Sequence, residues 1–443
     1  MAVYNNLTFL KKINLFLGEI LPLQLLRHIP FLRAVLNYSI TAFGGPQVAV
    51  GLMQHRFVEK RKDVTAEELM EYNAFCQLLP GASSTQTIIL IAYKRGGVIL
   101  AFFTLLIWIL PATIIMGSLA ILVTHFEFKG TLKSLQFLQP MAVGFLVSAA
   151  LLLYKKAIKS TITLSIFICT AIITFIGFKT PWTIPITIVL AGIVTNFSNK
   201  RIPDDGAAPK KVNWNSLFIF IVLFAMAGFL SEEATRQNWT YRKAFNLFEN
   251  NYRFGSLVFG GGDVLMPIMY EQYVTRPQSA IVKKNKRDVL KMTSEEFLTG
   301  SGLVRAIPGP IFSIASYTGA ISFKEKGLIG QIVGAIIGSI GVFLPSFLIV
   351  LFFFPIWQKL KKFAVFYRSL EGIYAAIVGI MTGASIFLIK DLYHEIEFGM
   401  PLHYMSYLFV FITSTFLIYK QKLSPQWIAI SCIFLGICWT FFQ

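Results

Sequence analysis

The chain has 443 residues, of which 55% are hydrophobic and 14% are charged. Since soluble domains carry about 25% charged residues, the composition excludes an ordinary globular protein and predicts an all-α, polytopic protein in a lipid bilayer. The formal net charge of +18 does not indicate a nucleic-acid partner, because the Lys and Arg residues lie in loops between apolar segments, where they favour a cytoplasmic membrane face.

The first half begins with a basic, amphipathic lead-in, residues 1–30, which we expect on the cytoplasmic face. A first repeat then covers residues 31–197. Its first two apolar segments are each broken, residues 31–54 at Gly44, Gly45 and Pro46, and residues 66–93 at Pro80 and Gly81. Four unbroken candidate spans follow, at residues 97–124, 135–154, 161–178 and 181–197.

A polar stretch, residues 198–213, predicts a cytoplasmic linker, and one extra transmembrane helix is expected at residues 214–230. The second repeat covers residues 231–443. Its broken segments are residues 254–274, interrupted by glycines, and residues 296–323, interrupted at Pro308–Pro310. Unbroken candidates follow at residues 327–354, 367–389, 402–419 and 425–442, which makes about thirteen crossings in all.

The two halves repeat one plan. The pair Pro80 and Gly81 matches Pro308 and Gly309, and the glycine break after Phe43 matches the one after Phe259. Because the extra helix makes the number of crossings between the repeats odd, the repeats are predicted to be inverted relative to each other. Discontinuous transmembrane helices in corresponding positions are the best sequence pointer to the binding site of a transporter.

We expect the protein in the cell (inner) membrane, and the distribution of charge predicts that its N-terminus is cytoplasmic. Strict alternation puts the basic loops around residues 155–159, 200–211, 283–291, 359–368 and 420–422 on one side. The basic loop 56–62 falls on the other side. Either the rule fails there, or the preceding break is re-entrant and the number of crossings changes.

Open backbone inside a bilayer persists only where protein buries it or where it lines a wet cavity. A helix that restarts at such a break points its free N–H groups and the positive end of its dipole into the gap, which suits an anion. The candidate binding residues at the breaks are Gly44, Gly45, Pro80, Gly81, Ser83, Ser84, Gln86, Gly260, Gly261, Gly262, Pro308, Gly309 and Ser313. The alternatives are close helix packing for the glycines and helix capping for the hydroxyls.

Arg305 lies inside the second Pro-Gly segment, where a charge is costly and indicates function. It is predicted to supply positive charge to a bound anion; the alternative is a structural ion pair with Asp263 or Glu296. Asp263 is either a proton or cation site or the partner of Arg305. Gln77, which occupies the position of Arg305 in the first repeat, is a candidate hydrogen-bond donor.

The sequence gives little support for metal binding, nucleotide binding or catalysis. The four cysteines form no CxxC pair, the five histidines form no ligand cluster, and the sequence contains no Walker P-loop and no nucleophile–base pair. We therefore expect no metal, no cofactor and no enzymatic activity.

At these motifs the sequence resembles the chromate ion transporter (CHR) family in its long, two-domain form. The resemblance rests on FGGP at Phe43, FVEKR at Phe57, FCQLLPGASSTQ at Phe75, FGGGDVLMP at Phe259 and the block GSGLVRAIPGPIFSIASYTG that begins at Gly300. It implies duplicated, oppositely oriented halves and efflux of a tetrahedral dianion such as chromate, with sulfate as a look-alike.

Four positions depart from the family pattern. Ala49 and Asp263 stand where the family usually has histidine, Arg305 where it has glutamine, and Ala82 where it has proline. These changes alter the expected charge of the site.

The sequence thus predicts a secondary active plasma-membrane exporter of a small inorganic oxyanion, chromate or sulfate, that works by alternating access. The alternatives are an anion channel or a transporter of a different small anion that uses the same breaks, or a membrane enzyme or scaffold that uses them for packing. A homodimer is left open.

Overall fold

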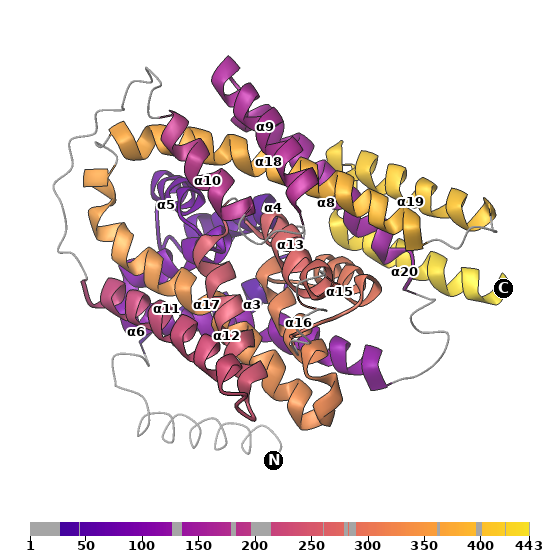
Figure 1. Cartoon of the computed structure of the whole chain (residues 1–443). Helices are drawn as coiled ribbons and strands as arrows, with labels where there is room; N and C mark the ends of the chain where they lie inside the picture. The colour runs from indigo at the N-terminus through magenta and orange to yellow at the C-terminus, as the bar shows by residue number, and fades with distance from the viewer. Residues whose placement is uncertain are drawn as a thin grey trace, which may run out of the picture.

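The computed structural model describes residues 27–43, 45–125, 135–178, 183–195, 214–259, 261–278, 282, 289–360, 364–395, 401–420 and 422–442. Regular secondary structure in these residues is helical throughout, so the predicted all-α fold is confirmed for them. The predicted linker and most of the predicted lead-in lie outside the described residues. Figure 1 shows α13, α15 and α16 near the middle of the molecule, with α8, α19 and α20 grouped at one end.

The first repeat contains both predicted breaks and all four predicted long segments. The bend at Gly96 and Gly97 divides α6 into two parts, which belong to two different predicted segments. The helices are α3 (Ile29–Ser39), α4 (Gly45–Met53), the π-helical turn η1 (Gln54–Lys60), α5 (Ala66–Leu78), α6 (Ser83–His125), α8 (Leu138–Ala157), α9 (Thr161–Gly177) and α10 (Thr183–Val194).

The predicted extra helix is α11 (Trp214–Arg236), and the second repeat follows it in the same order as the first. Its helices are α12 (Arg242–Leu257), α13 (Gly262–Tyr270), the turns η3 (Glu271–Thr275) and η4 (Arg276–Gln278), α15 (Ser294–Ala306), the turn η5 (Ile311–Ser313), α16 (Ile314–Ser322), the turn η6 (Lys324–Lys326), α17 (Gly327–Leu360), α18 (Ala364–Glu395), α19 (Pro401–Tyr419) and α20 (Pro425–Phe442).

Residues 231–249, between the predicted extra helix and the next broken segment, are largely helical. Helix α11 continues to Arg236, and α12 begins at Arg242. Helix α12 is polar, so hydropathy does not detect it. A tertiary contact engages one of its buried polar groups, since Asn251 Nδ2 donates to the Tyr273 hydroxyl at 3.1 Å.

The two repeats match at the level of backbone angles. Gly81 has φ +110° and Gly309 has φ +114°, while Gly97 and Gly327 have φ +69° and +70°. These are left-handed values that favour glycine. Helices α5 and α15 also begin alike, each with a capping box in which a threonine and a glutamate cap the first turn: Thr65 with Glu68, and Thr293 with Glu296.

In the first repeat, each broken segment folds back on itself as a helical hairpin. The end of η1 returns to the start of α3, because Arg61 Nη1 donates to the Pro30 carbonyl at 3.1 Å. The first part of α6 likewise returns to the start of α5, since Lys94 Nζ lies 2.6 Å from a Glu68 carboxylate oxygen. Both ends of each hairpin therefore lie together.

The second repeat does the same. Asn251 of α12 contacts Tyr273 of η3 across the first hairpin. Lys324, just after α16, forms an ion pair with Glu296 in the first turn of α15 across the second hairpin. The Tyr317 hydroxyl, on the returning arm, donates to the Glu296 carbonyl at 3.0 Å.

The long helices α6 and α17, which hold equivalent places in the two repeats, pack antiparallel. His125 Nε2, at the end of α6, lies 2.8 Å from Gln331 Oε1, near the start of α17. At the other end of the pair, the ring centroids of Phe102 and Phe347 are 6.0 Å apart.

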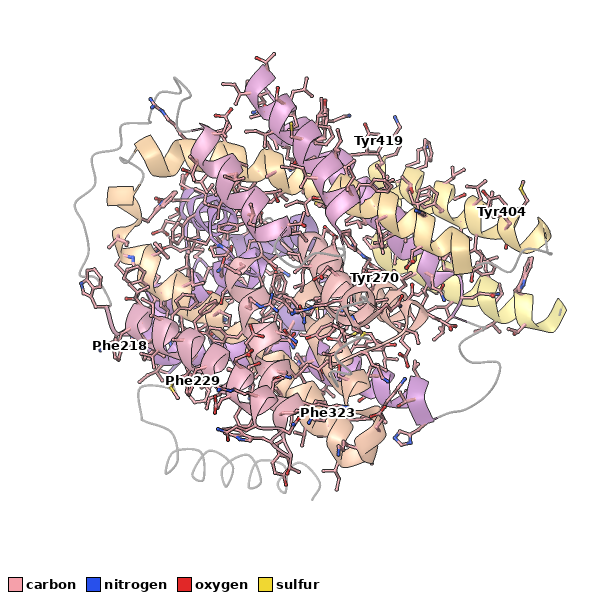
Figure 2. All side chains as sticks on the ribbon, viewed as in Figure 1. Phe218, Phe229, Tyr270, Phe323, Tyr404 and Tyr419 are labelled. Atoms are coloured by element: carbon pink, nitrogen blue, oxygen red, sulfur yellow. The ribbon has the colours of Figure 1, made fainter. Side chains whose placement is uncertain are left out.

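Helix α11 presents an apolar face to the outside of the molecule. Phe218 and Phe229 project outward from it and are 69% and 68% exposed (Figure 2). Among the described residues, five helices are long and apolar enough to cross a membrane, and four shorter apolar helices accompany them. This surface suits lipid rather than water.

Candidate functional site

The tips of the hairpins meet through reciprocal backbone hydrogen bonds. The N–H of Gly81, in the first repeat, donates to the carbonyl of Val258 in the second repeat at 2.7 Å. The N–H of Gly309, in the second repeat, donates to the carbonyl of Ala42 in the first at 3.0 Å. Ala42 and Val258 each directly precede the phenylalanine of a glycine break, so the two bonds occupy equivalent positions in the two repeats.

A small, partly open cavity lies where these tips meet. Residues from both repeats line it, and three of its walls are helix starts, those of α6, α13 and the η5–α16 pair. The lining residues are Ala42, Ala49, Ala82, Ser83, Ser84, Trp108, Gly261, Gly262, Gly309, Pro310, Ile311 and Phe312.

The first turn of a helix has N–H groups with no carbonyl one turn earlier to accept them. Five lining residues are in this situation: Ser83 and Ser84 at the start of α6, Gly262 at the start of α13, and Ile311 and Phe312 in η5. The hydroxyls of the two serines add side-chain donors. This arrangement is suited to a small anion.

Two further predicted residues are fully buried beside the cavity but do not line it. Gln86 Nε2 donates to the Pro80 carbonyl at 2.8 Å, so this side chain braces the Pro-Gly break, and its Oε1 has no partner among the described residues. Ser313, which directly follows the lining residue Phe312, has a buried Oγ without a described partner.

Arg305 forms an ion pair with Asp263, with Arg305 Nη2 2.7 Å from Asp263 Oδ1. The two side chains are 9% and 22% exposed, and neither residue lines the cavity. The guanidinium carbon also lies 5.1 Å from the centre of the Phe145 ring. Asp263 is in the first turn of α13 and Arg305 in the last turn of α15, so each charge complements a helix dipole, and the pair joins the two breaks of the second repeat.

The remaining predicted residues divide by position. Gly81 is packed against Ser346, whose Oγ accepts the N–H of Ala82 at 3.2 Å, and Gly309 is packed against Ala112. Pro80 and Pro308 form the breaks themselves, and the backbone of Gly45 begins α4. The side chain of Gln77 is exposed, and its carbonyl accepts the Tyr374 hydroxyl. Gly44 and Gly260 lie outside the described residues.

Sequence reasoning missed Trp108 and Ser346. Trp108 lines the cavity, donates from Nε1 to Thr85 Oγ1 at 2.9 Å and stacks on Tyr38, with ring centroids 4.6 Å apart. Ser346 directly follows Pro345. The paired Leu-Pro motifs at Leu110 and Leu344 are close to both residues in sequence and were the available signal.

Two repeats of broken helices whose tips enclose a cavity define a membrane transport protein as the class. A sequence model of the chromate transporter family matches residues 29–196 and 245–437. The chain therefore belongs to the chromate transporter family and is an integral membrane protein, as the sequence motifs predicted.

Several curated relatives cover most of the chain. An uncharacterised transporter of Methanocaldococcus jannaschii is 26% identical over 87% of this chain and 88% of its own length. A chromate transport protein of Cupriavidus metallidurans is 23% identical over 91% and 90%, and one of Pseudomonas aeruginosa is 24% identical over 79% and 78%. No solved structure matches the chain.

Proposed function

We propose that this protein is a secondary active transporter that exports a small tetrahedral oxyanion, chromate in the first instance, with sulfate as a competing substrate. The observation that carries the proposal is the cavity in which free N–H groups from helix starts of both repeats converge. The Cupriavidus and Pseudomonas relatives, which are chromate transport proteins, support the choice of chromate.

The positive potential for the anion comes from the helix starts rather than from a cation in the cavity wall. A helix N-terminus carries roughly +0.5 of an elementary charge. Three helix starts together therefore carry roughly +1.5, which offsets much of the charge of a dianion. Export also follows the membrane potential: at 100 mV, negative inside, the exit of a dianion is favoured by about 4.6 kcal/mol. Efflux therefore needs no coupled proton.

The hairpins support a revised membrane topology. Helices α5 and α15 have 13 residues each, about 20 Å of helix, whereas the hydrocarbon core is about 30 Å thick. We take all four broken segments to be re-entrant, which leaves nine crossings: the second part of α6, then α8, α9, α10, α11, α17, α18, α19 and α20.

This topology keeps the repeats inverted, since α11 still makes the number of crossings between them odd. The hairpins of the first repeat enter from one face and those of the second from the other, consistent with the antiparallel packing of α6 on α17. Rocking one repeat against the other would then open the cavity to each face in turn.

The nine-crossing topology also changes the charge pattern. The basic loop 56–62 moves to the face of the other first-repeat basic loops, and the loop that ends near Lys291 becomes the exception instead. The majority of basic loops still lie on the N-terminal face, which we assign to the cytoplasm.

The test is uptake of labelled chromate and sulfate into proteoliposomes under an inside-positive potential. We expect saturable uptake that Ser84→Val abolishes, because this substitution puts apolar bulk into the cavity and removes a donor. Ile114→Val, at a position that is 57% exposed on α6, is the matched control and should transport normally.

Counterflow separates a carrier from a channel. With the membrane potential clamped at zero, a carrier loaded with unlabelled sulfate accumulates labelled sulfate transiently, and a channel does not. Uptake that does not saturate and shows no counterflow would establish the channel. Absence of uptake of both anions by the folded wild type would contradict the proposed function.

A further inference from the structure

We propose that Ser346 is a positioning residue for the anion site, which holds the tip of the first Pro-Gly break in place across the boundary between the repeats. Gln86, which the sequence predicted as a binding residue, acts with it. This inference rests on the proposed function, since it takes the cavity beside this tip as the place where the anion binds. The identity of the oxyanion does not enter.

The two Pro-Gly tips follow the same backbone path. Gly81 and Gly309 have φ values of +110° and +114°, and each donates its N–H to a carbonyl of the other repeat. Each glycine also packs against the residue that directly follows a proline inside a long helix of the other repeat, Ser346 in α17 and Ala112 in α6. Ser346 and Ala112 therefore hold equivalent places, and their side chains can be compared directly.

The residue after the glycine differs between the tips in whether it has an N–H group. Ala82 is buried and donates its N–H to Ser346 Oγ at 3.2 Å. Pro310, at the equivalent position, has no N–H. The residue of α6 that packs on this second tip is Ala112, whose side chain has no acceptor. The N–H and the facing hydroxyl thus occur together at one tip and are absent together at the other.

Gln86 extends the same pattern. Its Nε2 donates to the Pro80 carbonyl at 2.8 Å and to the Ser346 carbonyl at 3.4 Å, so one side chain joins the break to α17. The equivalent residue of the second repeat is Ile314, which is apolar and fully buried. Three positions therefore carry hydrogen-bonding groups at the first tip that their counterparts at the second tip lack: Ala82, Gln86 and Ser346 against Pro310, Ile314 and Ala112.

This difference matters for the anion because the first tip leads directly into the cavity wall. Proline restricts its own φ, which is −75° at Pro310, and so stiffens the second tip without a partner. The first tip has Ala82 instead, and its hydrogen bonds to α17 provide the restraint. Ala82 lines the cavity and directly precedes the lining residues Ser83 and Ser84. Loss of the Ser346 hydroxyl therefore loosens the backbone that places these two serines.

The experiment gives the first tip the chemistry of the second. Ser346→Ala leaves the buried Ala82 N–H without its acceptor, and such a group typically changes an equilibrium constant by roughly fivefold to 150-fold. Ala82→Pro alone puts a ring carbon in the direction of this N–H, against the Ser346 hydroxyl. The double variant Ala82→Pro with Ser346→Ala removes the N–H, the hydroxyl and the clash together, and it reproduces the pair that the second tip already has.

The main readout is the dissociation constant for sulfate, measured by isothermal titration calorimetry on the full chain in detergent. We expect Ser346→Ala to weaken sulfate binding at least about fivefold and the double variant to bind within about twofold of the wild type. Ser339→Ala is the matched control, because Ser339 is buried on the same helix and its hydroxyl donates to the carbonyl of Ala335 in that helix. This control should bind sulfate normally.

Stability, measured on the same proteins by titration with sodium dodecyl sulfate, separates positioning from a merely structural role. If Ser346→Ala lowers stability but leaves the dissociation constant of the folded protein unchanged, the positioning role is overturned and the proposed function stands. A double variant that binds no better than Ser346→Ala would overturn the pairing of Ala82 with Ser346. A folded wild type that binds neither sulfate nor chromate would contradict the proposed function, and the positioning role would fall with it.

The second tip offers the reverse exchange, which keeps the test decisive if the double proline variant does not fold. Pro310→Ala introduces an N–H that faces Ala112, and Ala112→Ser adds an acceptor at the position that corresponds to Ser346. We expect Pro310→Ala to weaken sulfate binding at least about fivefold and the double variant Pro310→Ala with Ala112→Ser to regain most of this loss. Absence of any recovery would overturn the pairing.

Discussion

The ion pair between Arg305 and Asp263 gives the sharpest prediction, because the chain contains its own control. The first repeat has Gln77 at the position of Arg305 and Gln47 at the position of Asp263, and it folds into the same hairpins. The double variant Arg305→Gln with Asp263→Gln gives the second repeat the pair of residues that the first repeat already has. We expect this double variant to be more stable than either single variant.

The magnitude follows from the burial of the two side chains, which are 9% and 22% exposed. Removing one partner of a buried pair costs about 3–5 kcal/mol, mostly because the other charge remains buried without compensation. Since Asp263 is partly exposed, we expect a cost at or somewhat below the lower limit of this range for each single variant, about 2–3 kcal/mol. The double variant leaves no charge behind and should cost about 1 kcal/mol, so the coupling energy is about 3–5 kcal/mol.

The assay is the free energy of unfolding in mixed micelles titrated with sodium dodecyl sulfate, measured on the wild type, both single variants and the double variant. Transport of labelled sulfate is measured on the same four proteins. If the pair holds the start of α13 against the end of α15, the double variant should regain most of the transport that the single variants lose.

Two results would refute this reasoning. Additive costs of the two single variants would mean that the side chains are not coupled in the membrane protein. A double variant that is as stable as expected but does not transport would show that Arg305 supplies charge to the anion, as the sequence predicted.

Two further predictions test the hairpins. In a background without the native cysteines, Lys60→Cys and Lys94→Cys should both react with an impermeant maleimide from the same face, because the segment between them is re-entrant. Labelling from opposite faces would show that this segment crosses the membrane. Gly309→Ala should lower stability by about 2 kcal/mol or more and impair transport, since Gly309 has φ +114° and its added Cβ would lie 2.6 Å from the Ala112 Cβ. The control Gly228→Ala, inside α11 with open space around it, should be neutral or stabilising by up to about 1 kcal/mol.

The breaks could be predicted from the sequence because their causes are local. Proline removes a backbone donor and obstructs the preceding turn, and glycine permits left-handed angles, so Pro80-Gly81 and Pro308-Gly309 identify the interruptions without tertiary information. The duplication was equally visible, since both Pro-Gly pairs follow an acidic helix start. The starts of α5 and α15, the two helices before the Pro-Gly breaks, are explained by similar local rules, through the capping boxes at Thr65 and Thr293.

The fold-back of each broken segment could not be predicted from hydropathy. An apolar segment of 28 residues with a central break has the same composition whether its second arm continues across the bilayer or returns. The difference depends on long-range contacts, such as those of Glu68 with Lys94 and of Glu296 with Lys324. The violation of the positive-inside rule by residues 56–62 was the one sequence signal that pointed to a re-entrant segment.

The same argument explains which site residues were predicted well. Ser83, Ser84, Gly261, Gly262 and Gly309 line the cavity because their place is fixed by the backbone break itself. The position of Arg305 relative to the cavity depends instead on the direction of a long side chain and on its partner. A charge deep in an apolar segment indicates that a partner exists, but it does not say whether that partner is a substrate or, as the described contacts have it, Asp263.

In the proposed site, backbone N–H groups bind the anion while side chains orient it or exclude water. This difference explains why the two repeats can carry such different side chains at equivalent positions. Ser83 and Ser84 follow the first Pro-Gly break where Ile311 and Phe312 follow the second, yet the break glycines agree within a few degrees in φ. If the donors that hold the anion are mainly first-turn N–H groups, either pair of side chains supplies them equally. The serines then serve mainly to orient the anion from one side, and the apolar pair closes the other side against water, which strengthens each remaining hydrogen bond.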